Sequence, residues 1–185
     1  MTHYSIISSP MDDLILAADA SALTGVYFVG RDHIPGTSKK WTLASQHPVI
    51  QKASMQLQEY FACTRETFSV PLRPTGTAFQ ERVWREISLI PYGKTIHYSD
   101  LAERAGSPYA IRAAGTSTGR NPISIIIPCH RVVGKNGQLC GFAGGLERKR
   151  HLLEFEKSVT AQKQFSDPAL MPIGQSLERQ TAHEP

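Results

Sequence analysis

The chain lacks long apolar runs, a secretory pattern and paired cysteines. No stretch of its 185 residues approaches the ~18 consecutive apolar residues of a membrane-spanning helix, so we expect no membrane partner. Residues 1–7 show no basic segment followed by an apolar core, so we expect no secretory signal. The three cysteines, Cys63, Cys129 and Cys140, favour reduced thiols and a cytoplasmic protein. Because the cysteines and seven histidines fit no zinc spacing, we expect no metal.

Charge is unevenly distributed along the chain. Residues 73–158 hold 13 Lys/Arg against 7 Asp/Glu, a net charge of +6, and the remaining residues have a net charge of −2. This imbalance favours a polyanion-binding half, although a solvated lysine-rich surface is the plain alternative. Six of the basic residues lie in two places: Arg131 and Lys135, then Arg148, Lys149, Arg150 and Lys157.

Residues 1–72 predict a small α/β domain that supports the rest of the chain. The expected elements are strands at 3–8, 13–18 and 24–29, a loop over 31–46, a helix over 48–62 and a short strand at 68–72. In the helix an apolar residue recurs every four positions from Val49 to Phe61, and Pro48 suits a first helical position.

Residues 73–158 predict a mostly helical second domain that begins after a linker at 73–76. Thr77 followed by Gln80 is a capping-box arrangement that predicts a helix. The elements expected next are a turn at 91–94, a strand at 95–98, two short helices, a strand at 123–127, a strand at 132–133 with a hairpin-like Asn-Gly turn, a flexible loop at 141–145 and a helix at 146–157. Residues 159–185 are polar and predict a largely disordered tail.

The two short helices are typical of a helix-turn-helix. Ser99 caps the first, Gly106 ends it in a left-handed conformation, and Ser107-Pro108 opens the second, which runs to about residue 118. The second helix carries Arg112 among small residues that let a backbone approach DNA: Ala113, Ala114 and Gly115. The alternative is that these small residues simply pack against the first helix.

The run Ile-Ile-Ile-Pro-Cys-His-Arg at 125–131 points to covalent chemistry. It places the thiol of Cys129 at the mouth of an expected buried strand, beside His130 and close to cationic residues. Nearby cations lower a thiol pKa and favour the nucleophilic thiolate. The alternatives are an inert buried thiol and a core histidine.

Pro128-Cys129-His130-Arg131-Val132 resembles the active-site signature of the O6-alkylguanine-DNA alkyltransferases. The resemblance runs from about residue 77 to 156, and the N-terminal part matches more loosely. It implies a small ribonuclease-H-like α/β domain followed by a mostly helical winged helix-turn-helix domain. It also implies that double-stranded DNA bearing O6-alkylguanine is the partner.

The resemblance implies that Cys129 takes the alkyl group from O6 of guanine by direct displacement. The thiol would be polarised through a water by His130, which Glu156 would hold. From the residues alone, Glu156 is better interpreted as a carboxylate on a helix surface. Tyr98 would push the 3′ phosphate and protonate the departing guanine at N3, with a packed aromatic as the alternative. Because the product thioether cannot be hydrolysed, the protein acts once, and no cofactor is needed.

The family also implies roles in DNA binding and in the base pocket. Arg112 would fill the gap left by the flipped base, Asn121 would form the hinge between recognition helix and active-site strand, and Arg120 lies beside that hinge. The pocket residues implied are Val132, Cys140, Phe142 and Ala143, together with the carbonyl of Cys129.

This chain departs from the family at three pocket positions. Phe142 lacks the hydroxyl of the tyrosine found in many members, and Ala143 keeps only the backbone N–H where some have serine. Cys140 stands where others have glycine, which predicts a narrower pocket that disfavours large O6 substituents.

Two other functions agree less well with the sequence. A sensor that binds alkyl lesions without transfer commonly has tryptophan in place of the cysteine, which argues against it here. For a cysteine hydrolase, Cys129 and His130 on one strand would point to opposite sides, and the helix-turn-helix would be unexplained. We expect a monomer and leave open cooperative binding along DNA.

Overall fold

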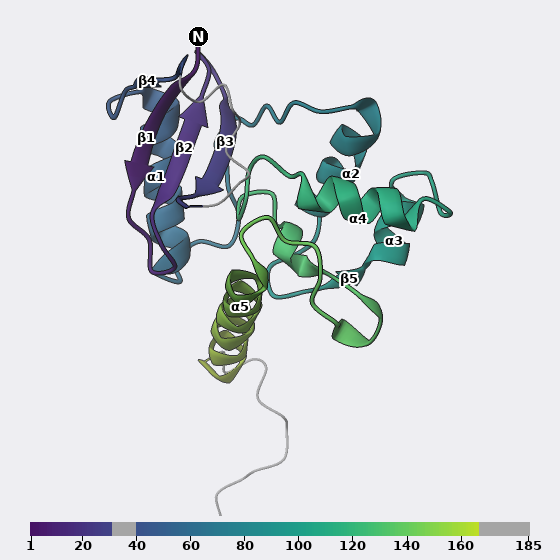
Figure 1. Ribbon diagram of the computed structural model, residues 1–185. Coiled ribbons are helices and arrows are strands. Elements are labelled where there is room, and N and C mark those ends of the chain that lie inside the picture. Colours follow the sequence, from purple (N-terminus) through teal and green to yellow (C-terminus); the bar gives the residue numbers. More distant parts are fainter. Residues whose placement is uncertain (31–39, 167–185) are drawn as a thin grey trace, which may run out of the picture.

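A four-stranded sheet covered by one helix forms the N-terminal part of the chain. The structure is a computed structural model and describes residues 1–30 and 40–166. The sheet order is β3-β2-β1-β4, with β1–β2 and β2–β3 antiparallel and β4 parallel to β1. The strands are β1 (His3–Ile7), β2 (Leu14–Ala18), β3 (Leu23–Phe28) and β4 (Thr42–Leu43), and α1 (Pro48–Phe61) packs against the sheet (Figure 1). The loop predicted at 31–46 thus contains β4, and its residues 31–39 lie outside the described residues.

The buried face of α1 is rotated from the predicted one. Ala53 and Leu57 of the predicted repeat are buried, but Val49 and Phe61 at its ends are only partly buried. Ile50 and Tyr60 are buried in their place. A strict four-residue repeat drifts around a helix of 3.6 residues per turn. The first and last residues of the repeat therefore lie at the edges of the buried face rather than at its centre. The correction matters because it turns Tyr60 inward.

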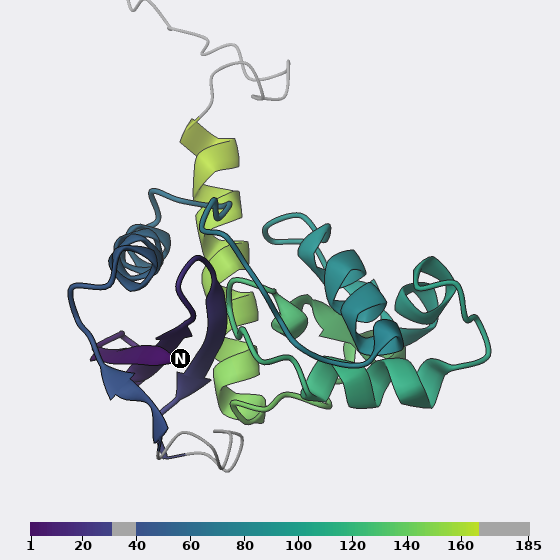
Figure 2. The same ribbon diagram turned by 90° about the horizontal axis from the view of Figure 1, so that it is seen from above.

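Helices dominate the C-terminal part. Its elements are α2 (Ala78–Ser88), α3 (Tyr98–Arg104), α4 (Ile111–Gly119), α5 (Leu146–Ser166), the parallel pair β5 (Ile96–His97) and β6 (Val132–Val133), and two 3-10 turns at Cys129–Arg131 and Lys135–Gly137. Figures 1 and 2 show α2, α3 and α4 gathered on one side of the molecule, the sheet with α1 on the other, and α5 between them. This arrangement confirms the predicted fold class of an N-terminal α/β part and a C-terminal helix-turn-helix part.

The predicted capping box of α2 is present. The side chain of Thr77 accepts from Gln80 N, and the Gln80 side chain accepts from Thr77 N at 2.9 Å. Trp84 on the buried face donates from Nε1 to Ser117 O at 2.8 Å, which ties α2 to α4.

The helix-turn-helix forms with different ends from those predicted. The first helix starts after His97, because Asp100 Oδ2 accepts from His97 N at 3.2 Å, so Ser99 is not its cap. Gly106 has φ +73°, as predicted. The second helix starts at Ile111, because residues 107–110 form a separate turn closed by Ala110 N donating to Ser107 O.

Neither apolar run predicted as a strand in the middle of the chain is one. Residues 68–72 contribute only an isolated bridge between Leu72 and Leu23. In residues 123–127, Ile123 forms one bridge to Val26, after which the chain turns with Ile125 at φ +71° and Ile127 N bonded to Ile123 O. The run is apolar because it is a turn buried on all sides, not because it belongs to a sheet.

Two further predictions need correction. Asn136 and Gly137 both have positive φ and form the predicted tight turn, but β6 before it pairs with β5 in parallel rather than forming a hairpin. Helix α5 continues to Ser166, where a disordered tail was expected from residue 159, and residues 167–185 lie outside the described residues. Val159 is 4% exposed, so packing extends the helix.

The outer edge of β3 joins the two parts. Val26 N donates to Pro122 O at 2.9 Å, and Ser124 N donates to Val26 O at 3.2 Å. The segment that leads to Cys129 is therefore hydrogen-bonded to the N-terminal sheet, so the position of the sheet constrains the position of Cys129.

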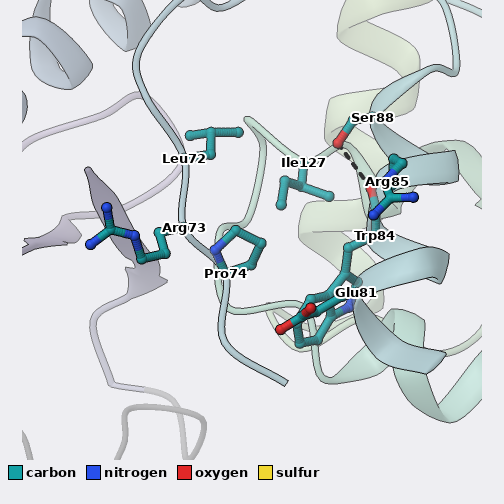
Figure 3. Close-up of a pocket in the computed structure, with 8 residues that line it drawn as sticks. All are labelled: Leu72, Arg73, Pro74, Glu81, Trp84, Arg85, Ser88 and Ile127. Carbon is teal, nitrogen blue, oxygen red and sulfur yellow. Dashed lines mark hydrogen bonds between the residues drawn. The ribbon is translucent and has the colours of Figure 1, made fainter. Parts of the chain in front are cut away.

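A cavity of about 390 Å³ lies between the linker and α2 (Figure 3). Its lining residues are Leu72, Arg73, Pro74, Glu81, Trp84, Arg85, Ser88 and Ile127. Because no cysteine or histidine lines it, the candidate chemistry lies elsewhere. Among the described residues, no helix is both long and apolar enough to cross a membrane.

Candidate active site

Asn121 fixes the loop that carries Cys129. Its Oδ1 accepts from Ile123 N at 3.0 Å, and its Nδ2 donates to Ile127 O at 2.8 Å and to Cys129 Sγ at 3.1 Å. Cys129 begins the 3-10 turn and is 1% exposed. The implied backbone contacts of Asn121 are thus present, and the same amide also orients the thiol.

The thiol of Cys129 is protonated at rest. Burial raises its pKa, and the hydrogen bond from Asn121 and the ammonium of Lys149 offset this only in part. The sequence had suggested a lowered pKa because cations lie close along the chain. In space Arg131 is paired with the carboxylate of Glu156, and a protonated thiol needs a base before it can act as a nucleophile.

His130 follows Cys129 in the same 3-10 turn. Its Nε2 lies 2.8 Å from Glu156 Oε1, both side chains have no exposed surface, and burial lowers the pKa of His130. The neutral ring therefore donates from Nε2 to the carboxylate, which leaves Nδ1 as an acceptor. Nδ1 is buried and has no partner among the described residues. The expectation that the side chains of Cys129 and His130 point to opposite sides assumed that both lie on one strand. In the structure both lie in a 3-10 turn.

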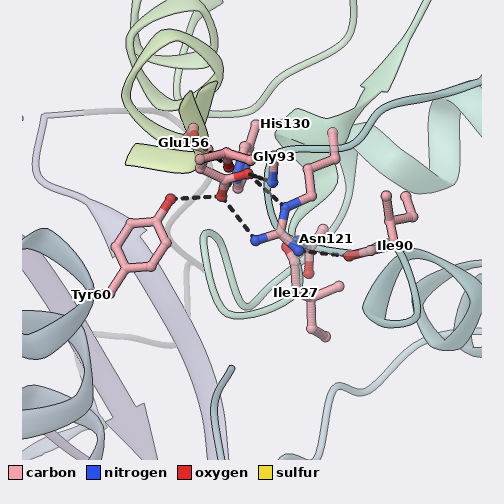
Figure 4. Close-up of polar contacts among 9 residues, drawn as sticks. Tyr60, Ile90, Gly93, Asn121, Ile127, His130 and Glu156 are labelled. Atoms are coloured by element: carbon pink, nitrogen blue, oxygen red, sulfur yellow. Dashed lines mark hydrogen bonds and ion pairs between the residues drawn. The ribbon is translucent and has the colours of Figure 1, made fainter. Parts of the chain in front are cut away.

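Glu156 accepts five hydrogen bonds (Figure 4). Oε1 accepts from Tyr60 Oη at 2.8 Å, from His130 Nε2 and from Arg131; Oε2 accepts from Gly93 N at 3.0 Å and from Arg131. Burial alone would raise the pKa of this carboxyl, but the hydrogen bonds from His130 and Arg131 and the charge of Arg131 hold it at about 2. The carboxylate is ionised at neutral pH, and the reading of Glu156 as a surface residue is wrong.

Arg131 neutralises that carboxylate. Its Nε and Nη2 each bond Glu156 at 2.9 Å, its Nη1 donates to Ile90 O at 2.6 Å, and its guanidinium lies 5.5 Å from the Tyr92 ring centre. Arg131 and Lys149 are 5% and 0% exposed, so neither belongs to the basic surface that the sequence suggested. The sequence reasoning missed this internal role because the motif gave no partner for the arginine.

Lys149 organises the other side of the site. Its Nζ donates to Val132 O and Cys140 O, each at 2.6 Å, and Tyr98 Oη donates to Cys140 O at 2.8 Å. Nζ also lies 3.4 Å from Tyr98 Oη. Burial lowers the pKa of Lys149 and raises the pKa of Tyr98, so Tyr98 is a neutral donor. Three of the residues implied by the resemblance thus meet at one lysine that the sequence reasoning missed.

The loop at 141–145 rests on the N-terminal sheet. The ring of Phe142 meets Phe28 edge-on, with ring centres 6.3 Å apart. Arg148 donates to Gly144 O at 2.7 Å, pairs with Asp12 and lies over the Phe28 ring. Ala143, next to Phe142, is partly exposed.

The predicted DNA-contacting residues of α4 divide into two sets. Arg112, Ala113 and Arg120 are exposed, whereas Ala114 is fully buried, which fits the packing alternative for that alanine. A Cβ added at Gly115 would meet the Tyr98 ring at 3.8 Å, so a small residue here lets α4 approach Tyr98 closely.

One signal in the sequence could have revealed Lys149 and Glu156. The residues of α5 buried to within a few per cent are Lys149, Leu152, Glu156 and Val159, spaced by three, four and three positions. Charged residues on the apolar face of a helix are buried and need partners. No such pattern marks Tyr60 as a partner, because 96 residues separate it from Glu156.

The hydroxyls of Tyr60 and Tyr92 form a matched pair for testing the hydrogen bonds to Glu156. Tyr60→Phe removes a buried bond to a carboxylate and should lower the free energy of unfolding by about 1.5–3 kcal/mol. Tyr92→Phe removes a buried hydroxyl with no partner among the described residues and should not destabilise the protein. Urea denaturation of both variants measures the difference, and equal losses would refute the interdomain bond.

Comparisons with known proteins agree with this geometry. The family model for the ribonuclease-like domain of 6-O-methylguanine DNA methyltransferase matches residues 2–74, and the model for its DNA-binding domain matches residues 78–158. The methylated-DNA–protein-cysteine methyltransferase of Haemophilus influenzae is 43% identical over 156 residues, covering 84% of this chain and 86% of that protein. The corresponding Bacillus subtilis constitutive protein is 40% identical over 161 residues, covering 85% and 96%.

Solved structures show the same fold. The crystal structure of the Mycobacterium tuberculosis O6-methylguanine methyltransferase is 44% identical in sequence and has a TM-score of 0.79. The match covers 85% of this chain and 94% of that protein. The structure of that protein in complex with DNA matches over the same shares, with a TM-score of 0.77. The chain belongs to the 6-O-methylguanine DNA methyltransferase family.

Proposed function

We propose that this protein repairs DNA by moving the alkyl group from O6 of guanine to Sγ of Cys129. The observation that carries the proposal is the buried thiol of Cys129 beside the His130–Glu156 pair, in the same domain as an exposed basic helix-turn-helix. The relatives named for this activity and the related structure bound to DNA support it.

In the proposed step, the bond between the alkyl carbon and O6 breaks as the bond between that carbon and Sγ forms. The thiol proton of Cys129 passes through a water to Nδ1 of His130, the ring nitrogen with no protein partner among the described residues. Glu156 remains ionised, since its pKa is about 2, and stabilises the imidazolium that forms.

The departing guanine takes up a proton at N3 from Tyr98. Burial makes this phenol a weak acid, but the ammonium of Lys149 at 3.4 Å is placed to stabilise the phenolate. The net result is that one proton leaves the thiol and one reaches the base. The proton on His130 is then available to restore Tyr98.

The target base must leave the duplex to reach a thiol that is 1% exposed. Arg112 is exposed on the first turn of α4 and fills the gap, and Arg120 at the other end of the helix contacts the backbone. Asn121 couples the end of α4 to the thiol through its bonds to the loop. Binding and chemistry are thereby connected by a single side chain.

The base is read by backbone groups of the pocket. The carbonyls of Cys129 and Val132 accept from the guanine amino group, while Phe142 and Ala143 contact the ring. Val132 O already accepts from Lys149, and a carbonyl has two lone pairs, so it can accept both.

The thioether product cannot be hydrolysed, so each molecule acts once. No cofactor is required, because the alkyl group comes from DNA itself. We place the reaction in the cytoplasm, where the thiols stay reduced, and expect the protein to act as a monomer.

Label transfer tests the proposed function. Incubation with duplex DNA carrying labelled O6-methylguanine should place one label on the peptide that contains Cys129, with a stoichiometry that does not exceed one. Cys129→Ala should bind the duplex and transfer nothing. Binding without transfer by the wild-type protein would instead indicate a lesion sensor, and release of labelled small product with turnover would indicate a hydrolase.

The size limit of the pocket has its own test. Cys140 lies at the pocket edge, with its carbonyl bonded to both Tyr98 and Lys149. Cys140→Gly should raise the rate with O6-benzylguanine relative to O6-methylguanine, because it removes the side chain that narrows the pocket. Cys140→Ser keeps the size of the side chain and should keep the wild-type ratio. An unchanged ratio in the glycine variant would show that Cys140 does not select the substrate.

A further inference from the structure

Tyr109 is an aromatic side chain with no support from the rest of the protein. It is 101% exposed, the highest value among the large apolar side chains of the described residues. It lies in the turn between α3 and α4, whose ends are held by backbone bonds from Ser107 N to Ala102 O and from Ala110 N to Ser107 O. The turn thus presents the ring to solvent from an ordered backbone, which is typical of a binding contact rather than of packing.

The surroundings of Tyr109 suit a polyanion. No Asp or Glu occurs between Glu103 and Glu147, while four cations of this stretch are exposed: Arg104, Arg112, Arg120 and Lys135. Next to the ring, Ile111 is 46% exposed and Arg112 is exposed. In Figures 1 and 2 the connection between α3 and α4 lies at the outer edge of the molecule, on the side away from the N-terminal sheet.

The distance along the chain limits where Tyr109 can reach. Tyr109 and Arg112 are three positions apart, and such a segment spans at most ~11 Å. One step along a DNA strand is ~3.4 Å, so the ring lies within about three nucleotides of the point where Arg112 enters.

We propose that Tyr109 is a DNA-binding residue that packs its ring against a nucleotide beside the flipped base. This inference rests on the proposed function for the place of the lesion. The contact is apolar: the ring stacks on a base or packs on its sugar, and the hydroxyl is not needed. Flipping makes such a contact available, because it leaves the neighbouring bases partly unstacked.

The experiment compares Tyr109→Ala and Tyr109→Phe with the wild-type protein. Transfer rates are measured at sub-saturating duplex carrying O6-methylguanine and, separately, with free O6-benzylguanine. Duplex affinity is measured over a range of salt concentrations. Met55→Ala, which removes a half-exposed apolar side chain from α1, is the matched control and should behave as wild type.

Tyr109→Ala should lower the transfer rate on duplex and the duplex affinity by about tenfold, the scale of one lost base–aromatic contact. Tyr109→Phe should keep the wild-type values, and neither variant should change the reaction with free base. The dependence of affinity on salt should be unaltered in Tyr109→Ala, because an apolar contact releases no counterion. In Arg120→Ala, which removes a cation proposed to contact the DNA backbone, the slope of this dependence should fall by about 1.

Several results would overturn the inference. The first is a Tyr109→Ala variant with wild-type transfer rate and affinity on duplex, and the second is an equal loss of its transfer rate with free O6-benzylguanine. The third is a loss of duplex affinity in Tyr109→Phe as large as in Tyr109→Ala, and the fourth is a changed salt slope of affinity in Tyr109→Ala. If the wild-type protein transfers no label, the proposed function fails, and the affinity series on duplex DNA still decides whether Tyr109 contacts DNA.

Discussion

The carboxylate of Glu156 is the group on which the rest of this structure depends. It lies in the interior, where an ionised carboxyl is costly, and it is kept ionised by five donors. Those donors come from α1, from the turn before β5 and from the 3-10 turn that begins with Cys129. A charge buried in this way stabilises one arrangement only, because displacing any donor leaves part of the carboxylate unpaired.

The N-terminal domain is therefore part of the site and not merely a support. Tyr60 bonds the carboxylate that holds His130, and Phe28 backs the loop of Phe142. Burial, together with the charge of Arg131, lowers the pKa of His130, so the ring is neutral and able to accept a proton. Cys129, His130 and the end of α4 are thus held in one connected set of hydrogen bonds.

The sequence predicted the local features and missed the distant ones. The capping box at Thr77 and the turn at Gly106 were predictable, because each depends on residues within a few positions. The apolar run before Cys129 was misread as a strand, since composition cannot distinguish a buried strand from a turn wound around an asparagine side chain. The bonds to Glu156 from Tyr60 join residues 96 positions apart, and only the family resemblance linked His130 to this glutamate.

The acid stability of Glu156→Gln tests the central claim most directly. The folded-state pKa of this carboxyl is about 2, below its ordinary value of 4.5, so its contribution to stability is complete above pH 4.5 and is lost as pH falls toward 2. The variant should be about 3–5 kcal/mol less stable at neutral pH, because it leaves Arg131 buried without a counter-charge. The difference between wild type and variant should then shrink as pH falls from 4.5 to 2. A difference that is small at neutral pH, or constant over that interval, would contradict the account.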